Sequence, residues 1–270
     1  MNQHLSIGPH TINLTQQGQG PALIWCHGLL QSMQAEDELG ITPFESLSRS
    51  FQVTRFDAVG HGKSSPSSFV EDYTWPNIAQ TIIDIADTLG IEKIILGGHS
   101  MGAASAIWAY HLFPKRIDAL VLQAPPSAFD NRKPLQAFFQ KQAQIIRKKG
   151  IEKWLDSKPI SKTPSILEPV SRIFEAINHK QLEKDPQVLA AMFEGAACSD
   201  LPPMRALETI KVPCYLMAWD QYPGHHITTC SQLCTLIPET LMHIAQNYQQ
   251  AQSDALRMIE FLHHQKHIKL

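Results

Sequence analysis

Short apolar runs alternate with helical repeats along the chain. Six runs of four to six residues are rich in apolar or β-branched side chains, as is typical of buried strands: 22–26, 51–56, 93–96, 117–122, 213–218 and 241–245. Between them, residues 77–89 carry apolar side chains close to a 3.6-residue period and end at Gly90, a common C-terminal stop. Residues 101–113 and 250–263 are predicted as further helices. Alternating strands and helices predict a mostly parallel sheet with helices on both faces.

This alternation stops between about residues 127 and 208. The segment has helix-like, polar sequence and is interrupted by several prolines. We therefore predict a core domain formed by residues 1–126 and 209–270, with a helical segment, 127–208, inserted between two strands. The segment holds 13 of the 23 Lys and Arg residues against 10 Asp and Glu. Solvated helix faces explain this bias more simply than a preference for an anionic substrate.

Composition excludes several classes of protein. With 270 residues, 43% of them apolar, the chain can form one sizeable core and is not disordered. A net charge of -2 gives no field to attract nucleic acid or an anionic membrane, and no apolar run nears the ~20 residues of a membrane span. The N-terminus lacks a signal-peptide pattern, and five scattered cysteines give no disulfide framework. We expect a cytoplasmic protein with a small-molecule partner and without a cofactor or metal.

The strongest chemical motif is Gly-His-Ser-Met-Gly at residues 98–102. It follows a predicted strand and opens a predicted helix, which is the context of a nucleophile elbow. The tight turn requires small flanking residues and exposes the hydroxyl of Ser100 at the end of the strand. The helix N-terminus favours developing negative charge at this point. Ser100 is therefore the predicted nucleophile.

Acyl transfer also needs two hydrogen-bond donors aimed at the oxyanion. The backbone N–H of Met101, next to the nucleophile, is one candidate. The loop that begins with His27-Gly28, directly after the first apolar run, supplies the second, the backbone N–H of Leu29. A further motif at residues 57–64 reads DAVGHGKS. We interpret it as a structural turn, in which glycines allow unusual backbone angles and Asp57 accepts hydrogen bonds from nearby amides.

In this order, the HG, D-x-x-G-H-G-x-S and G-H-S-M-G motifs resemble those of the α/β-hydrolase superfamily. More narrowly, they resemble its small esterases, lactonases and C–C hydrolases with a helical cap. The resemblance implies an α/β-hydrolase fold with an eight-stranded sheet and a helical cap inserted after the sixth strand. It also implies a serine, an acid and a histidine in that chain order.

The acid and the histidine depart from the family pattern. The family places an acid after the seventh strand, where Tyr222 stands before a proline, so Asp220 becomes the candidate acid. The family histidine follows the eighth strand, and none occurs near residues 247–248. His225, on the loop after the seventh strand, is the preferred base. His226 and His243 are the alternatives, together with no base at all.

These residues predict a serine hydrolase that cleaves a small carboxylic ester, lactone or related carbonyl compound through an acyl-enzyme on Ser100. A non-catalytic homologue that binds a ligand or protein partner is one alternative, because the expected histidine is missing. A C–C bond hydrolase is another, because it uses the same oxyanion site. A fold of this kind hosts many reactions and selects none of them.

Overall fold

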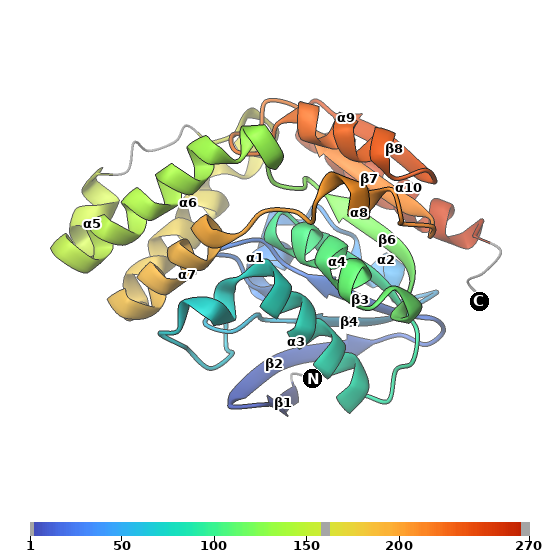
Figure 1. The fold of residues 1–270 in the computed structure, drawn as a ribbon, viewed down its shortest axis with the longest axis horizontal. Coiled ribbons are helices and arrows are strands. Elements are labelled where there is room, and N and C mark those ends of the chain that lie inside the picture. Colours follow the sequence, from blue (N-terminus) through green and yellow to red (C-terminus); the bar gives the residue numbers. More distant parts are fainter. Residues whose placement is uncertain (1–2, 158–162, 266–270) are drawn as a thin grey trace.

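The computed structural model, which describes residues 3–157 and 163–265, contains one eight-stranded sheet (Figure 1). Its strands are β1 (Gln3–Ile7), β2 (His10–Gln17), β3 (Ala22–Cys26), β4 (Gln52–Phe56), β5 (Ile94–His99), β6 (Ile117–Gln123), β7 (Cys214–Trp219) and β8 (Thr240–Ala245). Their order in the sheet is β1-β2-β4-β3-β5-β6-β7-β8, and all pairs from β4 to β8 are parallel. The predicted, mostly parallel sheet is confirmed.

The two antiparallel strands at one edge, β1 and β2, were absent from the apolar pattern. Most of their residues are polar, and β2 gives only two side chains, Ile12 and Leu14, to the apolar core, while the polar Asn13 between them is buried as well. An edge hairpin with one solvated face needs no continuous apolar run.

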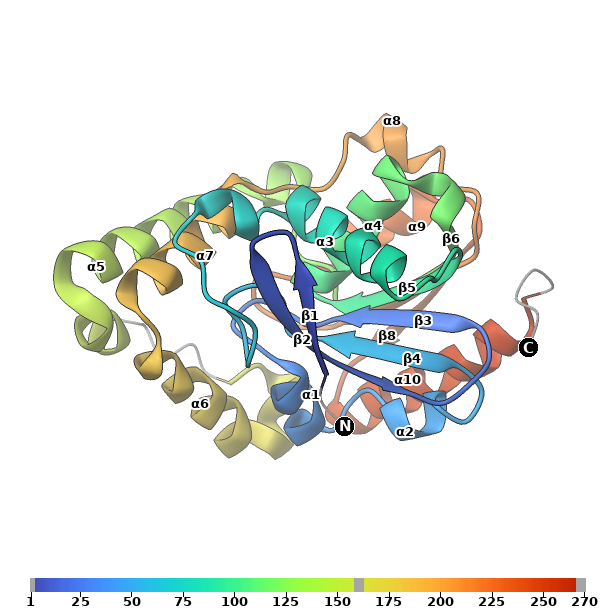
Figure 2. The same cartoon turned by 90° about the horizontal axis from the view of Figure 1, so that it is seen from below.

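Alternate residues of each central strand enter two separate apolar layers, one on each face of the sheet. In β5, Leu96 joins the layer under α3 (Trp75–Thr88), α4 (Met101–Leu112) and α9 (Ile227–Leu236). Its neighbour Ile95 joins the layer under α2 (Phe44–Leu47) and α10 (Tyr248–His263). Figure 2 shows these two groups of helices on opposite faces, as predicted.

The remaining helices are α1 (Met33–Leu39), α5 (Lys133–Ser157), α6 (Ser171–His179), α7 (Pro186–Cys198) and α8 (Met204–Leu207), with 3₁₀ turns at Val70–Tyr73, Pro114–Arg116, Phe129–Asn131, Ser165–Val170 and Lys180–Glu183. Helices α5 to α8 all lie between β6 and β7 in the sequence. Figure 2 shows α5, α6 and α7 together beyond the end to which β3 and β4 point.

Helices α5 and α7 are joined by both charge and packing. Arg147 donates two hydrogen bonds to the carboxylate of Glu194, at 2.8 and 2.7 Å. The rings of Trp154 and Phe193, one from each helix, lie 5.6 Å apart. The predicted boundaries of this segment, 127–208, include residues 158–162, and the predicted core includes residues 1–2 and 266–270; all of these lie outside the described residues.

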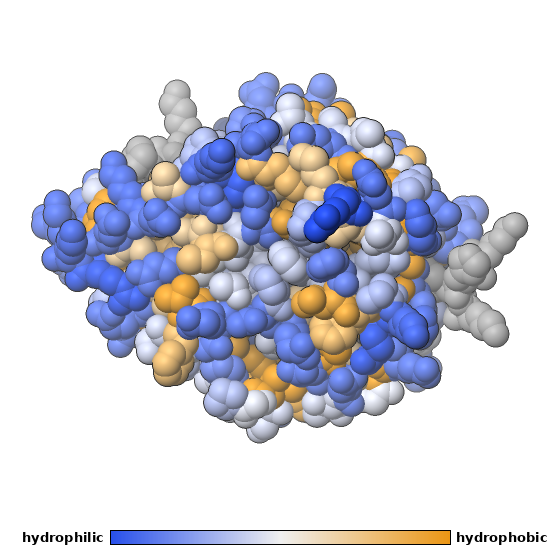
Figure 3. Space-filling model, viewed as in Figure 1, coloured by the Kyte–Doolittle hydropathy of each residue, from blue (hydrophilic) through white to orange (hydrophobic). Residues whose placement is uncertain are grey.

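On the face seen in Figure 3, hydrophilic residues surround several small groups of hydrophobic ones, as is common for a globular surface.

Candidate active site

Ser100 lies on a sharp turn between β5, which ends at His99, and α4, which begins at Met101. Its φ of 52° and ψ of -108° belong to a backbone conformation that L-residues rarely adopt. The turn is held by a hydrogen bond of 2.9 Å from the Ser100 N–H to the Gln123 carbonyl at the end of β6.

The two glycines that flank Ser100 are required by close packing against β3. A Cβ atom on Gly102 would lie 1.9 Å from the Cys26 carbonyl oxygen, and one on Gly98 would lie 2.6 Å from the same atom. No side chain fits at either position, which explains the motif physically. The strained turn is the observed counterpart of the predicted elbow.

The Ser100 hydroxyl and an imidazole from the loop after β7 face one another. The distance from Ser100 Oγ to His225 Nε2 is 2.8 Å, and His225 Nδ1 lies 2.9 Å from the Pro223 carbonyl oxygen. A carbonyl oxygen can only accept, so Nδ1 carries the proton and Nε2 of the neutral ring holds a free lone pair. Nε2 can therefore accept the proton of the Ser100 hydroxyl.

The surroundings of His225 keep its imidazole neutral. The side chain retains some contact with solvent, yet desolvation lowers its pKa to about 4, and the nearby positive charge of Arg132 acts in the same direction. The hydrogen bond to Pro223 opposes this shift without reversing it. The Tyr222 ring stacks on the imidazole, with centroids 4.1 Å apart and planes 19° from parallel. His225 thus carries a neutral imidazole held by a backbone carbonyl and an aromatic ring.

Asp220 does not occupy the position that the sequence led us to expect. Its Oδ1 accepts a hydrogen bond of 2.9 Å from the Gln221 N–H and so caps the turn that follows β7. The partner of His225 Nδ1 is the Pro223 carbonyl. The loop folds back on itself within five residues, so a backbone oxygen reaches the imidazole before the carboxylate does.

The two alternative histidines lie elsewhere. The backbone N–H of His226 donates to Ser127 Oγ, and its side chain is exposed. His243 lies within β8, where its ring packs 5.4 Å from Tyr215 and its Nδ1 lies 3.9 Å from Asp254. Tyr215 belongs to the apolar layer under α10, on the other face of the sheet from α4. Neither histidine is brought to Ser100.

The predicted oxyanion donors belong to the same cavity as Ser100 and His225. This cavity of about 410 Å³ is lined by Leu29 and Met101 and, on its apolar walls, by residues of α5, α6 and α7. Leu30, next to Leu29, has a φ of 63°, and its N–H donates to His61 Nε2 at 3.2 Å. His61 therefore fixes the conformation of the loop that presents the Leu29 amide. We did not predict this role of His61 from the sequence, although its position between Gly60 and Gly62 could have indicated it.

The turn at residues 57–64 is structural, as predicted. The Asp57 carboxylate accepts hydrogen bonds from the N–H groups of Met33 and Lys63, at 2.8 and 2.9 Å, and from the Asn13 amide at 2.7 Å. Gly60 and Gly62 both have positive φ, 72° and 49°. The side chain of Asp57 thus ties this turn to the start of α1 and to β2.

Three histidines around this site are buried and neutral: His27, His61 and His99. Burial lowers the pKa of His27, moves that of His61 well below its ordinary value, and lowers that of His99 to about 3. Each serves as a hydrogen-bonding group within the loops. For example, His27 Nε2 accepts from the Ala58 N–H at 3.0 Å.

Over residues 3–157 and 163–265, no group of three His, Cys, Asp or Glu side chains could hold a metal ion. Nor is any helix in that part of the chain long and apolar enough to cross a membrane.

The sequence matches a model of the alpha/beta hydrolase fold family over residues 21–163, so this chain belongs to that family. Among solved structures, an enol-lactonase from Burkholderia xenovorans LB400 is similar with a TM-score of 0.80 and 18% identity, covering 97% of this chain and 100% of that one. A thermophilic esterase from Thermogutta terrifontis has a TM-score of 0.81 and 18% identity, covering 100% of both chains. At these identities the structures support the fold alone.

A 2-(acetamidomethylene)succinate hydrolase from Mesorhizobium japonicum is 28% identical over 121 residues, which are 45% of this chain and 41% of the relative. For two other curated relatives the matched stretch spans 33% and 29% of their length, about a third. These matches do not extend over the whole of any of these relatives.

Proposed function

We propose that the protein is a serine hydrolase that cleaves a small carboxylic ester, lactone or related carbonyl compound. The observation that carries this proposal is the contact of 2.8 Å between Ser100 Oγ and His225 Nε2, at a cavity that the Leu29 and Met101 residues also line. A strained serine beside a neutral imidazole is the arrangement that activates a hydroxyl.

The chemistry follows from the positions of these atoms. Ser100 Oγ attacks the substrate carbonyl carbon while His225 Nε2 takes the hydroxyl proton, and the carbonyl oxygen becomes an oxyanion facing the Leu29 and Met101 amides. When the carbon–oxygen bond breaks, His225 returns this proton to the departing alkoxide. Water then attacks the acyl-enzyme while His225 Nε2 takes one of its protons. The bond between the carbonyl carbon and Ser100 Oγ breaks, His225 returns the proton to Oγ, and the acid product leaves.

In this scheme Pro223 and Tyr222 replace the carboxylate of a conventional triad. The Pro223 carbonyl selects the tautomer of His225, and the stacked Tyr222 ring restricts the plane of the imidazole. A neutral carbonyl stabilises the imidazolium less than a carboxylate does. Turnover should therefore be slower than with a charged third residue.

We further propose that the segment at residues 127–208 acts as a cap that shapes the substrate pocket. Phe138, Phe139 and Phe193 come from α5 and α7 and line the cavity together with Ser100. Their walls suit an apolar acyl group of modest size. A cytoplasmic location remains a prediction from the sequence.

The proposal is tested with a fluorophosphonate probe on the purified protein, with the adduct located by peptide mass. The variants are Ser100→Ala, His225→Ala and Asp220→Asn, and His226→Ala is the matched control because it removes an adjacent, exposed imidazole. We expect labelling of Ser100 that disappears with the first two variants and persists with the other two.

Each other outcome has a definite meaning. Labelling that survives His225→Ala would assign the base to another residue and reject the mechanism above. Labelling lost with Asp220→Asn in folded protein would restore a conventional triad. Absence of labelling in the folded wild type would reject the hydrolase and favour a non-catalytic protein that binds a ligand in the same cavity.

A further inference from the structure

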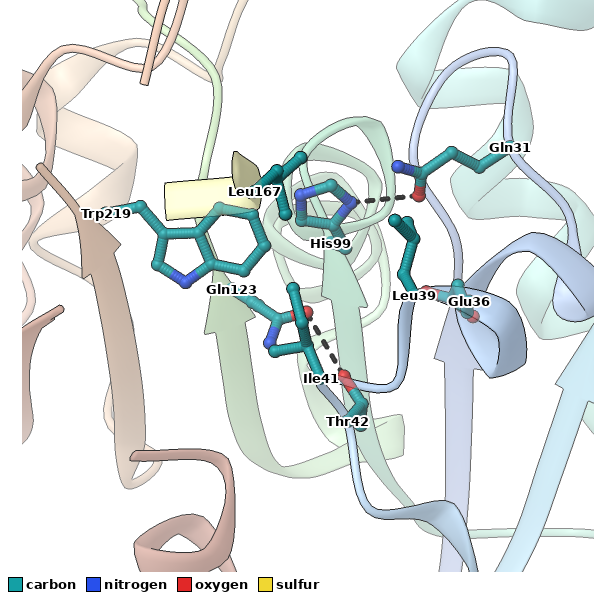
Figure 4. Close-up of a pocket in the computed structure, with 9 residues that line it drawn as sticks. All are labelled: Gln31, Glu36, Leu39, Ile41, Thr42, His99, Gln123, Leu167 and Trp219. Carbon is teal, nitrogen blue, oxygen red and sulfur yellow. Dashed lines mark hydrogen bonds between the residues drawn. The ribbon is translucent and has the colours of Figure 1, made fainter. Parts of the chain in front are cut away.

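A second, much smaller cavity lies beneath the elbow. Its volume is about 20 Å³, and its lining comprises Gln31, Glu36, Leu39, Ile41, Thr42, His99, Gln123, Leu167 and Trp219 (Figure 4). A cavity must offer at least roughly 10–15 Å³ before it can hold a water molecule. The space therefore fits one water and nothing larger.

Three polar atoms of this lining are buried without a hydrogen-bond partner in the described part of the chain: His99 Nε2, Gln123 Nε2 and Trp219 Nε1. Their side chains are at most 4% exposed. Buried polar groups are almost always satisfied by protein or by ordered water, because leaving them unpaired costs free energy. Three such atoms around one small cavity point to a shared partner.

The hydrogen-bonding character of each atom follows from its neighbours. Gln123 Oε1 accepts from the Thr42 hydroxyl at 3.2 Å, which leaves its NH₂ group as a donor, and the indole of Trp219 can only donate. Figure 4 shows the indole nitrogen and this amide turned towards each other. Two donors that face each other need an acceptor between them.

His99 supplies the complementary acceptor. Its Nδ1 lies 3.1 Å from Gln31 Oε1, an oxygen that already accepts from the Gly28 N–H, so Nδ1 carries the proton. The buried ring is neutral, which leaves Nε2 with a lone pair. The lining thus offers two donors and one acceptor, a set that one water molecule can satisfy.

We propose that this cavity binds one ordered water, which accepts hydrogen bonds from Trp219 and Gln123 and donates one to His99. A cation does not suit the two donors. An anion does not suit the Glu36 carboxyl in the lining or the space available.

The position of this water gives it a structural role. His99, Gln123 and Trp219 are the last residues of β5, β6 and β7, three neighbouring parallel strands. Ser100 follows the first of these strands, and the loop that carries His225 follows the third. One water therefore links the strand ends from which both residues depart. This inference does not depend on whether Ser100 is catalytic.

A crystal structure of the wild-type protein at high resolution tests the proposal directly. We expect one density peak within hydrogen-bond distance of Trp219 Nε1 and of at least one of the other two atoms. An empty cavity, or a direct bond between the Gln123 amide and either ring, would overturn it.

Water-to-protein cross-relaxation in solution gives a second test. The chain has five tryptophans, and the Trp219→Phe variant identifies the Trp219 indole proton by its disappearance. We expect this proton to cross-relax with water in the sense that marks a residence time above a nanosecond. The internal reference is Trp154, a buried indole that donates to Gln142 Oε1 at 2.8 Å and should show no such signal. If neither indole proton showed cross-relaxation with water, the proposal would be contradicted.

Discussion

Acid pH is the perturbation that tests the proposed base most directly. Desolvation lowers the pKa of His225 to about 4. The active form of a general base is the deprotonated one, which is present above this pKa and is lost as the pH falls through it. The activity of the enzyme should therefore persist well below neutral pH.

The size of the effect follows from the two pKa values. At pH 5.5 a histidine with the ordinary pKa of about 6.5 is about 90% protonated, so kcat/KM would fall to about a tenth of its value at pH 7.5. With the pKa of His225 at about 4, only about 3% of the base is protonated at pH 5.5. The ratio of kcat/KM between pH 5.5 and 7.5 should then be close to one.

The assay is hydrolysis of a small activated ester over pH 4 to 8, with each sample returned to pH 7.5 afterwards to exclude loss through unfolding. A reversible acid limb centred near pH 6.5 or above would refute the reasoning, because it would require a nearby carboxylate that stabilises the imidazolium. The Asp220→Asn variant identifies that carboxylate: its acid limb should coincide with that of the wild type if the Pro223 carbonyl is the only partner of Nδ1.

Three other results are expected. Tyr222→Leu should lower kcat about 10- to 100-fold with little change in KM, while Tyr222→Phe keeps the stacked ring and most of the activity; equal losses would argue against stacking. Gly102→Ala should prevent stable folding. At Gly150 a Cβ meets nothing within 4 Å, so Gly150→Ala should cost only the strain of its backbone conformation (φ 81°, ψ 170°), about 1–3 kcal/mol in urea unfolding. Between pH 7 and 5.5 the free energy of unfolding should fall by at least about 1 kcal/mol. Protonation of His99 and His225 in the unfolded state lowers it by about 2–3 kcal/mol, and proton uptake by Glu36, whose pKa burial raises to about 7, offsets about 1–2 kcal/mol of this loss. The lowered pKa values of His27 and His61 add to the loss, and a flat urea-unfolding profile would contradict this prediction.

The loss of stability at low pH follows from the number of protons that the unfolded and folded states bind. A histidine whose pKa is lowered by folding binds fewer protons in the folded state, so stability is lost as the pH falls below about 6.5. Glu36 behaves in the opposite way, because its raised pKa lets the folded state take up a proton first. The histidines outnumber it, and the net change is destabilising.

The sequence by itself determined the parts of the fold that depend on local pattern. Apolar runs of strand length and the helical period of residues 77–89 predicted the parallel part of the sheet and the helices on both faces. The elbow could be predicted from the sequence because backbone contacts at residues 98 and 102 leave no room for a side chain, so both positions must be glycine. The edge strands β1 and β2 left no such signal, since the register of β2 is decided by its pairing with β4 and that of β1 by its pairing with β2.

The contact of Ser100 with His225 joins residues that are 125 positions apart, and only the tertiary structure could establish it. The sequence offered three histidines and one carboxylate for the site. It could not show that the loop after β7 turns back so that the Pro223 carbonyl, rather than Asp220, reaches the imidazole. A local pattern records which side chains are available. The backbone conformation of a loop, and therefore which oxygen meets which nitrogen, is set by everything that packs around it.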